Sequence, residues 1–133
     1  MKKNYIEYDT MHWSKIKDPE TALKKYLNNY KDIYNKINIE KIVNVITNDR
    51  KLKILDYGGG IGFLSAELKK LGHEITLADQ SEEALSTAAY YFKKENLDIN
   101  VFKADKGYFN MDVKFDIIIA KDLIEHVIED KRI

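Results

Sequence analysis

The feature that most constrains this 133-residue chain is a glycine cluster that directly follows a short apolar segment. Four of the six glycines lie within Gly58–Gly62, after the strand-like segment Lys51–Asp56. Glycine has no Cβ, so these residues let the backbone turn tightly and let a ligand approach the main chain closely. Residues 62–71 then have the pattern of a helix that stops at Gly72. The cluster therefore predicts a strand, a tight loop and a helix in succession.

The same alternation of strand and helix continues along the chain. Further strands are expected at 74–78, 99–102 and 115–120, and the apolar composition of the last one suggests burial on both faces. Between the strands at 74–78 and 99–102, a helix is expected to start after Ser81 as its N-cap and to stop near Asn96. This alternation predicts an α/β fold, a Rossmann-like doubly wound sheet that is mostly parallel.

The first 50 residues have a different character, since their pattern is helical throughout. Asp18 and Pro19 are suited to be the N-cap and first residue of a helix. A second helix is expected at about 38–48. We therefore expect a helical cap or lid segment at 1–50, followed by the core at 51–133. The apolar positions expected on the first helix are Leu23, Tyr26, Leu27, Tyr30 and Tyr34.

Composition narrows the classes of function. Hydrophobic residues make up 44% of the chain and charged residues 33%, which suits one globular domain with its own core. The formal net charge is zero, so there is no electrostatic reason to expect nucleic-acid binding. Cysteine is absent, which excludes disulfides, thiolate metal sites and a cysteine nucleophile. With no apolar run of signal-peptide or membrane-spanning length, a soluble cytoplasmic protein is expected.

Three acidic residues follow three successive strands. Ligands of open α/β sheets bind at the carboxyl ends of the strands, and Asp56, Asp79 and Asp105 all fall there. The carboxylate of Asp79 can accept hydrogen bonds from both hydroxyls of a ribose. Dinucleotide-binding folds use the same device, so Asp79 alone does not discriminate between cofactors. A purely helix-capping role for Asp79 is less favoured because Ser81 already serves as the cap.

The glycine spacing does discriminate. A dinucleotide fingerprint needs glycines at its first, third and sixth positions; Gly58 and Gly60 fit, but the sixth position is Phe63. The spacing is instead Gly-x-Gly-x-Gly, with Asp56 two residues before the first glycine. That pattern resembles motif I of the class I S-adenosylmethionine-dependent methyltransferases. An acidic loop suits a ligand with a cationic sulfonium and an ammonium group better than it suits a pyrophosphate.

The resemblance implies roles for individual residues. Asp79 would bind the ribose, and Asp105 would accept from the adenine amino group, with a solvated loop acid as the alternative for Asp105. Gln80 departs from the apolar residue that the family usually places against adenine, which leaves its stacking role in doubt. The expected cofactor-binding residues are Asp56, Tyr57, Gly58, Gly59, Gly60, Gly62, Asp79, Gln80, Asp105 and Lys121.

The segment 115–127 is the second specific signal. Its Phe-Asp strand and the following Glu-His-Val resemble the subgroup that includes the ubiquinone-biosynthesis O-methyltransferases, and the resemblance covers about residues 51–127. It implies that His126 is a general base or orients the acceptor; the alternative is a helix-start histidine bonded to backbone. Asp122, Glu125 and His126 resemble a metal-binding group of some relatives, but a capping Asp and a solvated Glu are favoured, and no metal is expected.

The implied reaction is transfer of a methyl group from S-adenosylmethionine to a small-molecule acceptor. Trp13, with Tyr8 and His12, precedes the first helix and would either line the acceptor pocket or pack between helices. The family has seven strands and only four are recognisable here. We therefore expect a chain truncated after the fourth strand, self-associating through that exposed strand and inactive alone. The alternatives are a non-catalytic cofactor-binding fragment or interaction module, and an NAD-type oxidoreductase domain, against which Phe63 counts.

Overall fold

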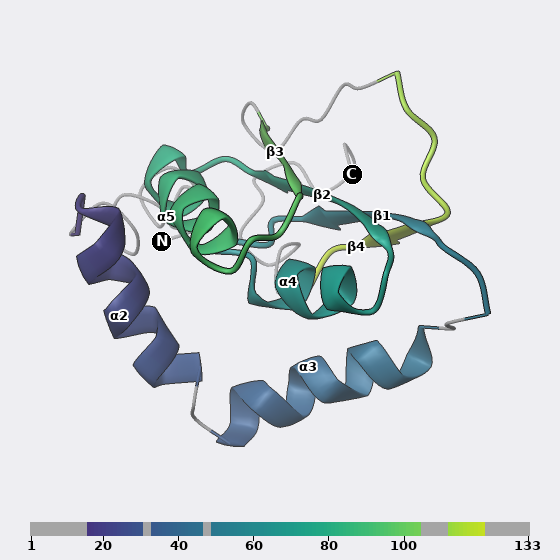
Figure 1. Ribbon diagram of the computed structural model, residues 1–133, viewed down its shortest axis with the longest axis horizontal. Coiled ribbons are helices and arrows are strands. Elements are labelled where there is room, and N and C mark those ends of the chain that lie inside the picture. Colours follow the sequence, from purple (N-terminus) through teal and green to yellow (C-terminus); the bar gives the residue numbers. More distant parts are fainter. Residues whose placement is uncertain (1–15, 31–32, 47–48, 105–111, 122–133) are drawn as a thin grey trace, which may run out of the picture.

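The structure is a computed structural model that describes residues 16–30, 33–46, 49–104 and 112–121. From the first strand to the third, strands and helices alternate along these residues, as the sequence pattern predicts (Figure 1). The elements in chain order are α2 (Pro19–Tyr30), α3 (Ile33–Val45), β1 (Lys53–Tyr57), α4 (Phe63–Lys70), β2 (Glu74–Asp79), α5 (Glu82–Lys94), β3 (Asn100–Lys103) and β4 (Ile117–Ile119).

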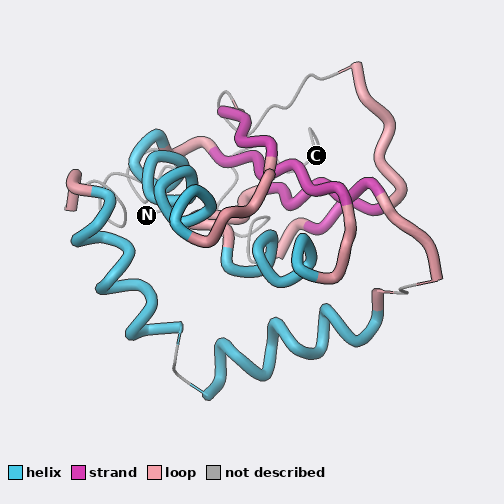
Figure 2. The backbone as a smooth tube through the Cα atoms, viewed as in Figure 1, coloured by secondary structure: helices cyan, strands magenta, loops and turns pink. Residues whose placement is uncertain are grey.

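The four strands form one parallel sheet in the order β3-β2-β1-β4. Figure 2 shows these strands in magenta, with the helices in cyan lying to one side of them. In the register of the sheet, Asp56 pairs with Leu77 and with Ile119, so β1 lies between β2 and β4. The order of β1 and β2 brings their carboxyl ends next to each other. The predicted α/β fold with a parallel, Rossmann-like sheet is confirmed.

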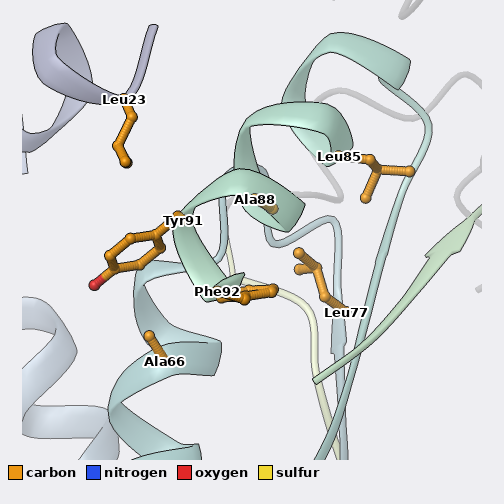
Figure 3. Close-up of a cluster of buried hydrophobic side chains, with 7 residues drawn as sticks. All are labelled: Leu23, Ala66, Leu77, Leu85, Ala88, Tyr91 and Phe92. Carbon is orange, nitrogen blue, oxygen red and sulfur yellow. The ribbon is translucent and has the colours of Figure 1, made fainter. Parts of the chain in front are cut away.

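Helices α4 and α5 cover one face of the sheet. Because side chains alternate along a strand, Ile75 and Leu77 of β2 point to the same face. Leu77 contacts a buried cluster that includes residues of α2, α4 and α5, and Leu23 of α2 contributes to it from the N-terminal segment (Figure 3). The members of this cluster are Leu23, Ala66, Leu77, Leu85, Ala88, Tyr91 and Phe92.

Helix α3 packs in the same layer. Its Ile39, together with Ile46 just after the helix, joins a second buried cluster that contains Ile54 of β1 and Ile75 of β2. The remaining members are Leu52, Leu64 and Leu68. Helices α2 and α3 therefore share buried contacts with the sheet layer, which places these two helices against the core. The division into a cap at 1–50 and a core at 51–133 stays a prediction.

The predicted caps are confirmed. The Asp18 carboxylate accepts from Thr21 N at 3.0 Å, and the Ser81 hydroxyl accepts from Ala84 N at 3.1 Å. Asn96 has a φ of 56°, the left-handed conformation that ends helices. The boundary between the first two helices is different from the prediction. Tyr34 lies in α3, which begins at Ile33 and not near residue 38. The prediction was wrong because the sequence between the two helices contains no Gly or Pro to indicate a boundary.

The prediction that the fourth strand is buried on both faces is wrong. Ile117 and Ile119 pack against the cluster beneath α3 and α4, but the side chain of Ile118 is 61% exposed. Strand β4 is the last strand of the described sheet, and Ile118 points to the face opposite the helices α2–α5. Its start is held by Asp116, whose carboxylate accepts from Lys53 N at 2.8 Å while its own N–H donates to Lys53 O.

Candidate functional site

The glycine loop begins where β1 ends. Gly58 N donates to Ala78 O of β2 at 2.7 Å, and Gly62 N donates to Gly59 O at 3.1 Å, which closes the turn into α4. Gly62 has a φ of 82° and packs so closely on the Phe92 ring that a Cβ there would strike it. Only glycine satisfies both conditions at position 62. The loop is thus held against β2 and α5 as well as between its own ends.

Asp56 lies under this loop. Its side chain is 2% exposed, and its Oδ2 atom accepts from the Ser65 hydroxyl of α4 at 2.7 Å. Burial raises the pKa of Asp56 to about 6, the charge of Asp79 contributes to that rise, and the Ser65 hydrogen bond and the charge of Lys121 oppose it. A Cβ on Gly59 would come within 2.5 Å of Asp56 Oδ2, so the loop backbone rests directly on this carboxylate.

Asp79 joins the loop to the next helix. Its Oδ2 accepts from Gly60 N at 2.8 Å and its Oδ1 accepts from Ser81 N at 2.9 Å. The residue is 5% exposed, and burial raises its pKa against the lowering effect of these backbone hydrogen bonds. Asp79 therefore links the glycine loop to the start of α5, in addition to ending β2. Beyond β2, Ala104 N donates to Asp79 O at 2.9 Å and sets where the chain leaves β3.

Three further predicted residues lie around these carboxylates. Tyr57 is 5% exposed, and burial together with the charge of Asp79 raises its pKa. Gln80 has a buried Oε1 atom that no hydrogen-bond donor of the described residues reaches. Lys121 follows β4 and lies near enough for its positive charge to lower the pKa of Asp56. The carboxyl ends of β1, β2 and β4 thus bring together carboxylates, an ammonium group and a buried amide oxygen.

The structure brings nine of the ten predicted cofactor-binding residues to this edge of the sheet. They are Asp56, Tyr57, Gly58, Gly59, Gly60, Gly62, Asp79, Gln80 and Lys121. Asp105 and His126 lie outside the described residues, as do Asp122, Glu125, Tyr8, His12 and Trp13. Their predicted roles stay predictions.

Ser65 is the site residue that sequence reasoning missed. Its side chain is fully buried, and its backbone N–H as well as its hydroxyl lowers the pKa of Asp56. A signal for it existed: the N-cap of α4 is Gly62, which has no side chain to satisfy the first N–H groups of the helix. The Asp56 carboxylate accepts one of these N–H groups, that of Ser65.

Two further features of the described residues concern metal ligands and the length of the helices. Within it, no three His, Cys, Asp or Glu side chains are grouped closely enough to hold a metal ion. None of the described helices combines the length and the apolar character needed to cross a membrane. His73 is buried at the amino end of β2, where its Nδ1 accepts from Leu52 N at 3.1 Å, so it lies at the opposite end of the strands from the loop.

Known proteins share both the sequence pattern and the fold. The chain is 36% identical over 89 residues to the ubiquinone biosynthesis O-methyltransferase of Rickettsia prowazekii, covering 67% of this chain and 35% of that protein. It is 33% identical over 116 residues to the enzyme of the same name from Pelagibacter ubique, covering 83% and 48%. The chain thus spans less than half the length of these two relatives.

A solved structure shows the same fold. An S-adenosylmethionine-dependent methyltransferase from Clostridium acetobutylicum superposes with a TM-score of 0.54 at 23% identity, covering 77% of this chain and 49% of that one. The sequence model of the methyltransferase domain family matches residues 54–133, which include nearly all of β1, the glycine loop and all three later strands. The match favours the methyltransferase prediction over an NAD-type oxidoreductase domain. This chain belongs to the methyltransferase domain family.

Proposed function

We propose that this chain binds S-adenosylmethionine at the carboxyl ends of β1 and β2 and holds it for methyl transfer to a small-molecule acceptor. The observation that carries the proposal is the 2.8 Å hydrogen bond from Gly60 N to Asp79 Oδ2. It joins the glycine loop and the carboxylate of the next strand into one surface at the edge where α/β sheets bind ligands. When bound, the cofactor supplies an electrophilic methyl group on its sulfonium.

The donor and acceptor chemistry of the residues fits this cofactor. The Asp79 carboxylate accepts from Gly60 N through Oδ2 and from Ser81 N through Oδ1, and the backbone N–H of Gln80 is a third donor to it. A carboxylate has about four acceptor positions, so it has room for a further donor. Two ribose hydroxyls are donors of the required kind. The buried Oε1 of Gln80 is an acceptor that no donor of the described residues reaches, and the adenine amino group would supply one.

The charge at the site fits as well. The buried Asp56 carboxylate places negative charge beneath the loop, where its interaction with a cation is weakly screened. The ligand carries a sulfonium and an ammonium group and no phosphate. A pyrophosphate would instead meet two buried carboxylates at this edge, which is unfavourable. This difference supports S-adenosylmethionine over NAD.

Calorimetric titration tests the proposal. We expect S-adenosylmethionine and S-adenosylhomocysteine to bind the chain and NAD to bind more weakly or not at all. Adenosine serves as a control, because it offers the ribose and adenine without the cationic end. Tighter binding of NAD than of S-adenosylhomocysteine would overturn the proposed cofactor.

The proposed acceptor is a small molecule with an oxygen nucleophile. The name that the two relatives share, an O-methyltransferase of ubiquinone biosynthesis, supports this class, and the zero net charge of the chain supports it over a nucleic acid. In-line methyl transfer depends on alignment and exclusion of water. In this proposal His126 accepts a proton from the acceptor or orients it, Asp105 binds adenine, and the segment 1–50 covers the cofactor.

We also propose that the isolated 133-residue polypeptide self-associates through β4. The side chain of Ile118 is 61% exposed in the middle of that strand, and β4 pairs with only β1 among the described strands. A strand edge with an apolar side chain favours pairing with another copy. A polypeptide that pairs in this way, and that binds the cofactor without transferring a methyl group, would be a cofactor-binding fragment. This is the second candidate function.

A further inference from the structure

Ser65 of α4, which follows the glycine loop, forms a hydrogen bond to Asp56 of β1, which precedes the loop. Its hydroxyl donates to Asp56 Oδ2 at 2.7 Å, across a separation of nine residues that includes the whole loop. The side chain of Ser65 is fully buried and that of Asp56 is 2% exposed, so water does not compete for this hydrogen bond. A buried hydrogen bond to a charged acceptor is stronger than one between neutral groups.

The carboxylate that accepts this hydrogen bond lies against the loop backbone. A Cβ on Gly59 would come within 2.5 Å of both Asp56 Oδ2 and Leu77 Cδ1, so the backbone at Gly59 is in close contact with the carboxylate below it. The next residue, Gly60, donates its N–H to Asp79. We therefore expect a shift of the Asp56 carboxylate to displace the loop relative to Asp79.

Opposing influences act on the charge of Asp56. Burial disfavours the charged form of Asp56, and the Asp79 carboxylate on the neighbouring strand β2 disfavours it further. Opposing them are the hydroxyl and N–H of Ser65 on α4 and the ammonium group of Lys121 after β4. Ser65 contributes through a hydrogen bond, in which its hydroxyl donates to Asp56 Oδ2 at 2.7 Å.

We propose that Ser65 is a positioning residue that holds the Asp56 carboxylate, ionised and oriented, beneath Gly59, so that the loop keeps the shape and charge that bind the cofactor. The inference rests on the proposed function, because it assigns a role at that same site. Ser65 does not contact the cofactor in this account. Its effect reaches the ligand through Asp56 and the backbone of Gly59 and Gly60.

The experiment measures S-adenosylhomocysteine affinity by calorimetry from pH 5.5 to 8.5 in the wild type and in Ser65→Ala. For the wild type we expect affinity to fall as the pH decreases through about 6, where Asp56 takes up a proton. For Ser65→Ala we expect roughly tenfold weaker binding at pH 7 and a midpoint at higher pH, because one hydrogen bond to the charged form is lost. Asp56→Asn should abolish the pH dependence, and Ser65→Ala added to it should have little further effect.

Thr87→Ala is the matched control. It removes another buried hydroxyl, which donates within α5 to Glu83 O at 3.0 Å and lies on a different element from the loop. It should lower thermal stability without moving the pH midpoint. If Ser65→Ala does not fold, Ser65→Cys, with a similar size and a weak donor, should shift the midpoint in the same direction.

Two results separate the possible failures. A wild-type chain that does not bind S-adenosylhomocysteine would overturn the proposed function itself. A wild type that binds, together with a folded Ser65 variant of unchanged affinity and unchanged pH midpoint, would overturn only the positioning role.

Discussion

The Asp56 carboxylate lies directly beneath Gly59, so closely that a Cβ on that glycine would come within 2.5 Å of Asp56 Oδ2. This contact joins the end of β1 to the loop that follows it. The loop therefore depends on a buried charge for its position as well as on the conformational freedom of glycine.

Gly59→Ala should weaken cofactor binding and lower stability by about 1–3 kcal/mol, since the added methyl group overlaps Asp56 and Leu77. Gly72→Ala is the control, because Gly72 has a φ of 97° and a methyl group added there would meet none of the described atoms within 4 Å. It should strain only the backbone and leave affinity unchanged. Thermal unfolding and calorimetric titration measure both effects, and equal affinities for the two variants would contradict the prediction.

Asp79→Ala should weaken S-adenosylhomocysteine binding by about 2–4 kcal/mol, through loss of two charge-assisted hydrogen bonds to the ribose. Because Asp79 also accepts from Gly60 N and Ser81 N, some loss of stability should accompany it. Asp79→Asn keeps an acceptor for one of these N–H groups and should be intermediate. An unchanged dissociation constant in folded Asp79→Ala would show that the residue is only structural.

Asp56 should make the stability of the chain fall as the pH rises from about 4 to about 7. Burial raises its pKa in the folded state from 3.8 to about 6, so in that window the folded state binds more protons than the unfolded state. The pKa difference corresponds to about 3 kcal/mol at neutral pH. Denaturant unfolding of Asp56→Asn and of the wild type should therefore show a difference in the free energy of unfolding that grows in favour of the variant with pH. A constant difference would argue against a raised pKa.

Ile118→Lys should reduce self-association of the 133-residue polypeptide, because a charge in the middle of β4 opposes pairing of strand edges. Light scattering measures the change in mass. Val45→Lys is the matched control, since Val45 is 86% exposed and lies on the helix α3, which has no strand edge to pair. If the wild type is a monomer, or if both variants change its mass equally, β4 is not the interface.

His126→Ala should lower the rate of methyl transfer while leaving cofactor affinity nearly unchanged, if His126 acts on the acceptor's proton. A radiolabelled methyl-transfer assay and calorimetry of the same variant separate the two effects. Survival of the rate, or loss of affinity together with it, would assign His126 to the scaffold.

Much of the fold and most of the candidate site could be predicted from local pattern. The glycine spacing after β1, the caps at Asp18 and Ser81, and the acids at strand ends each depend on neighbouring residues only. Such features report backbone conformation and hydrogen bonding within a few positions, and the chain order of strands and helices then restricts the topology. For that reason the sheet edge that gathers Asp56, Gly60 and Asp79 could be predicted from the sequence.

What only the tertiary structure decided are the contacts between distant segments. Composition predicts an apolar β4 but not that Ile118 is exposed, because exposure depends on which elements cover each face of the sheet. The break between α2 and α3 has no sequence marker, since helix ends without Gly or Pro are set by packing. The hydrogen bond from Ser65 to Asp56 depends on how α4 lies against β1, and the raised pKa of Asp56 depends on its burial there. The sequence by itself determined which residues stand at the edge of the sheet. Three-dimensional packing decided their burial, their hydrogen-bond partners and the pKa values of their carboxyl groups, because these properties arise only when the layers come together.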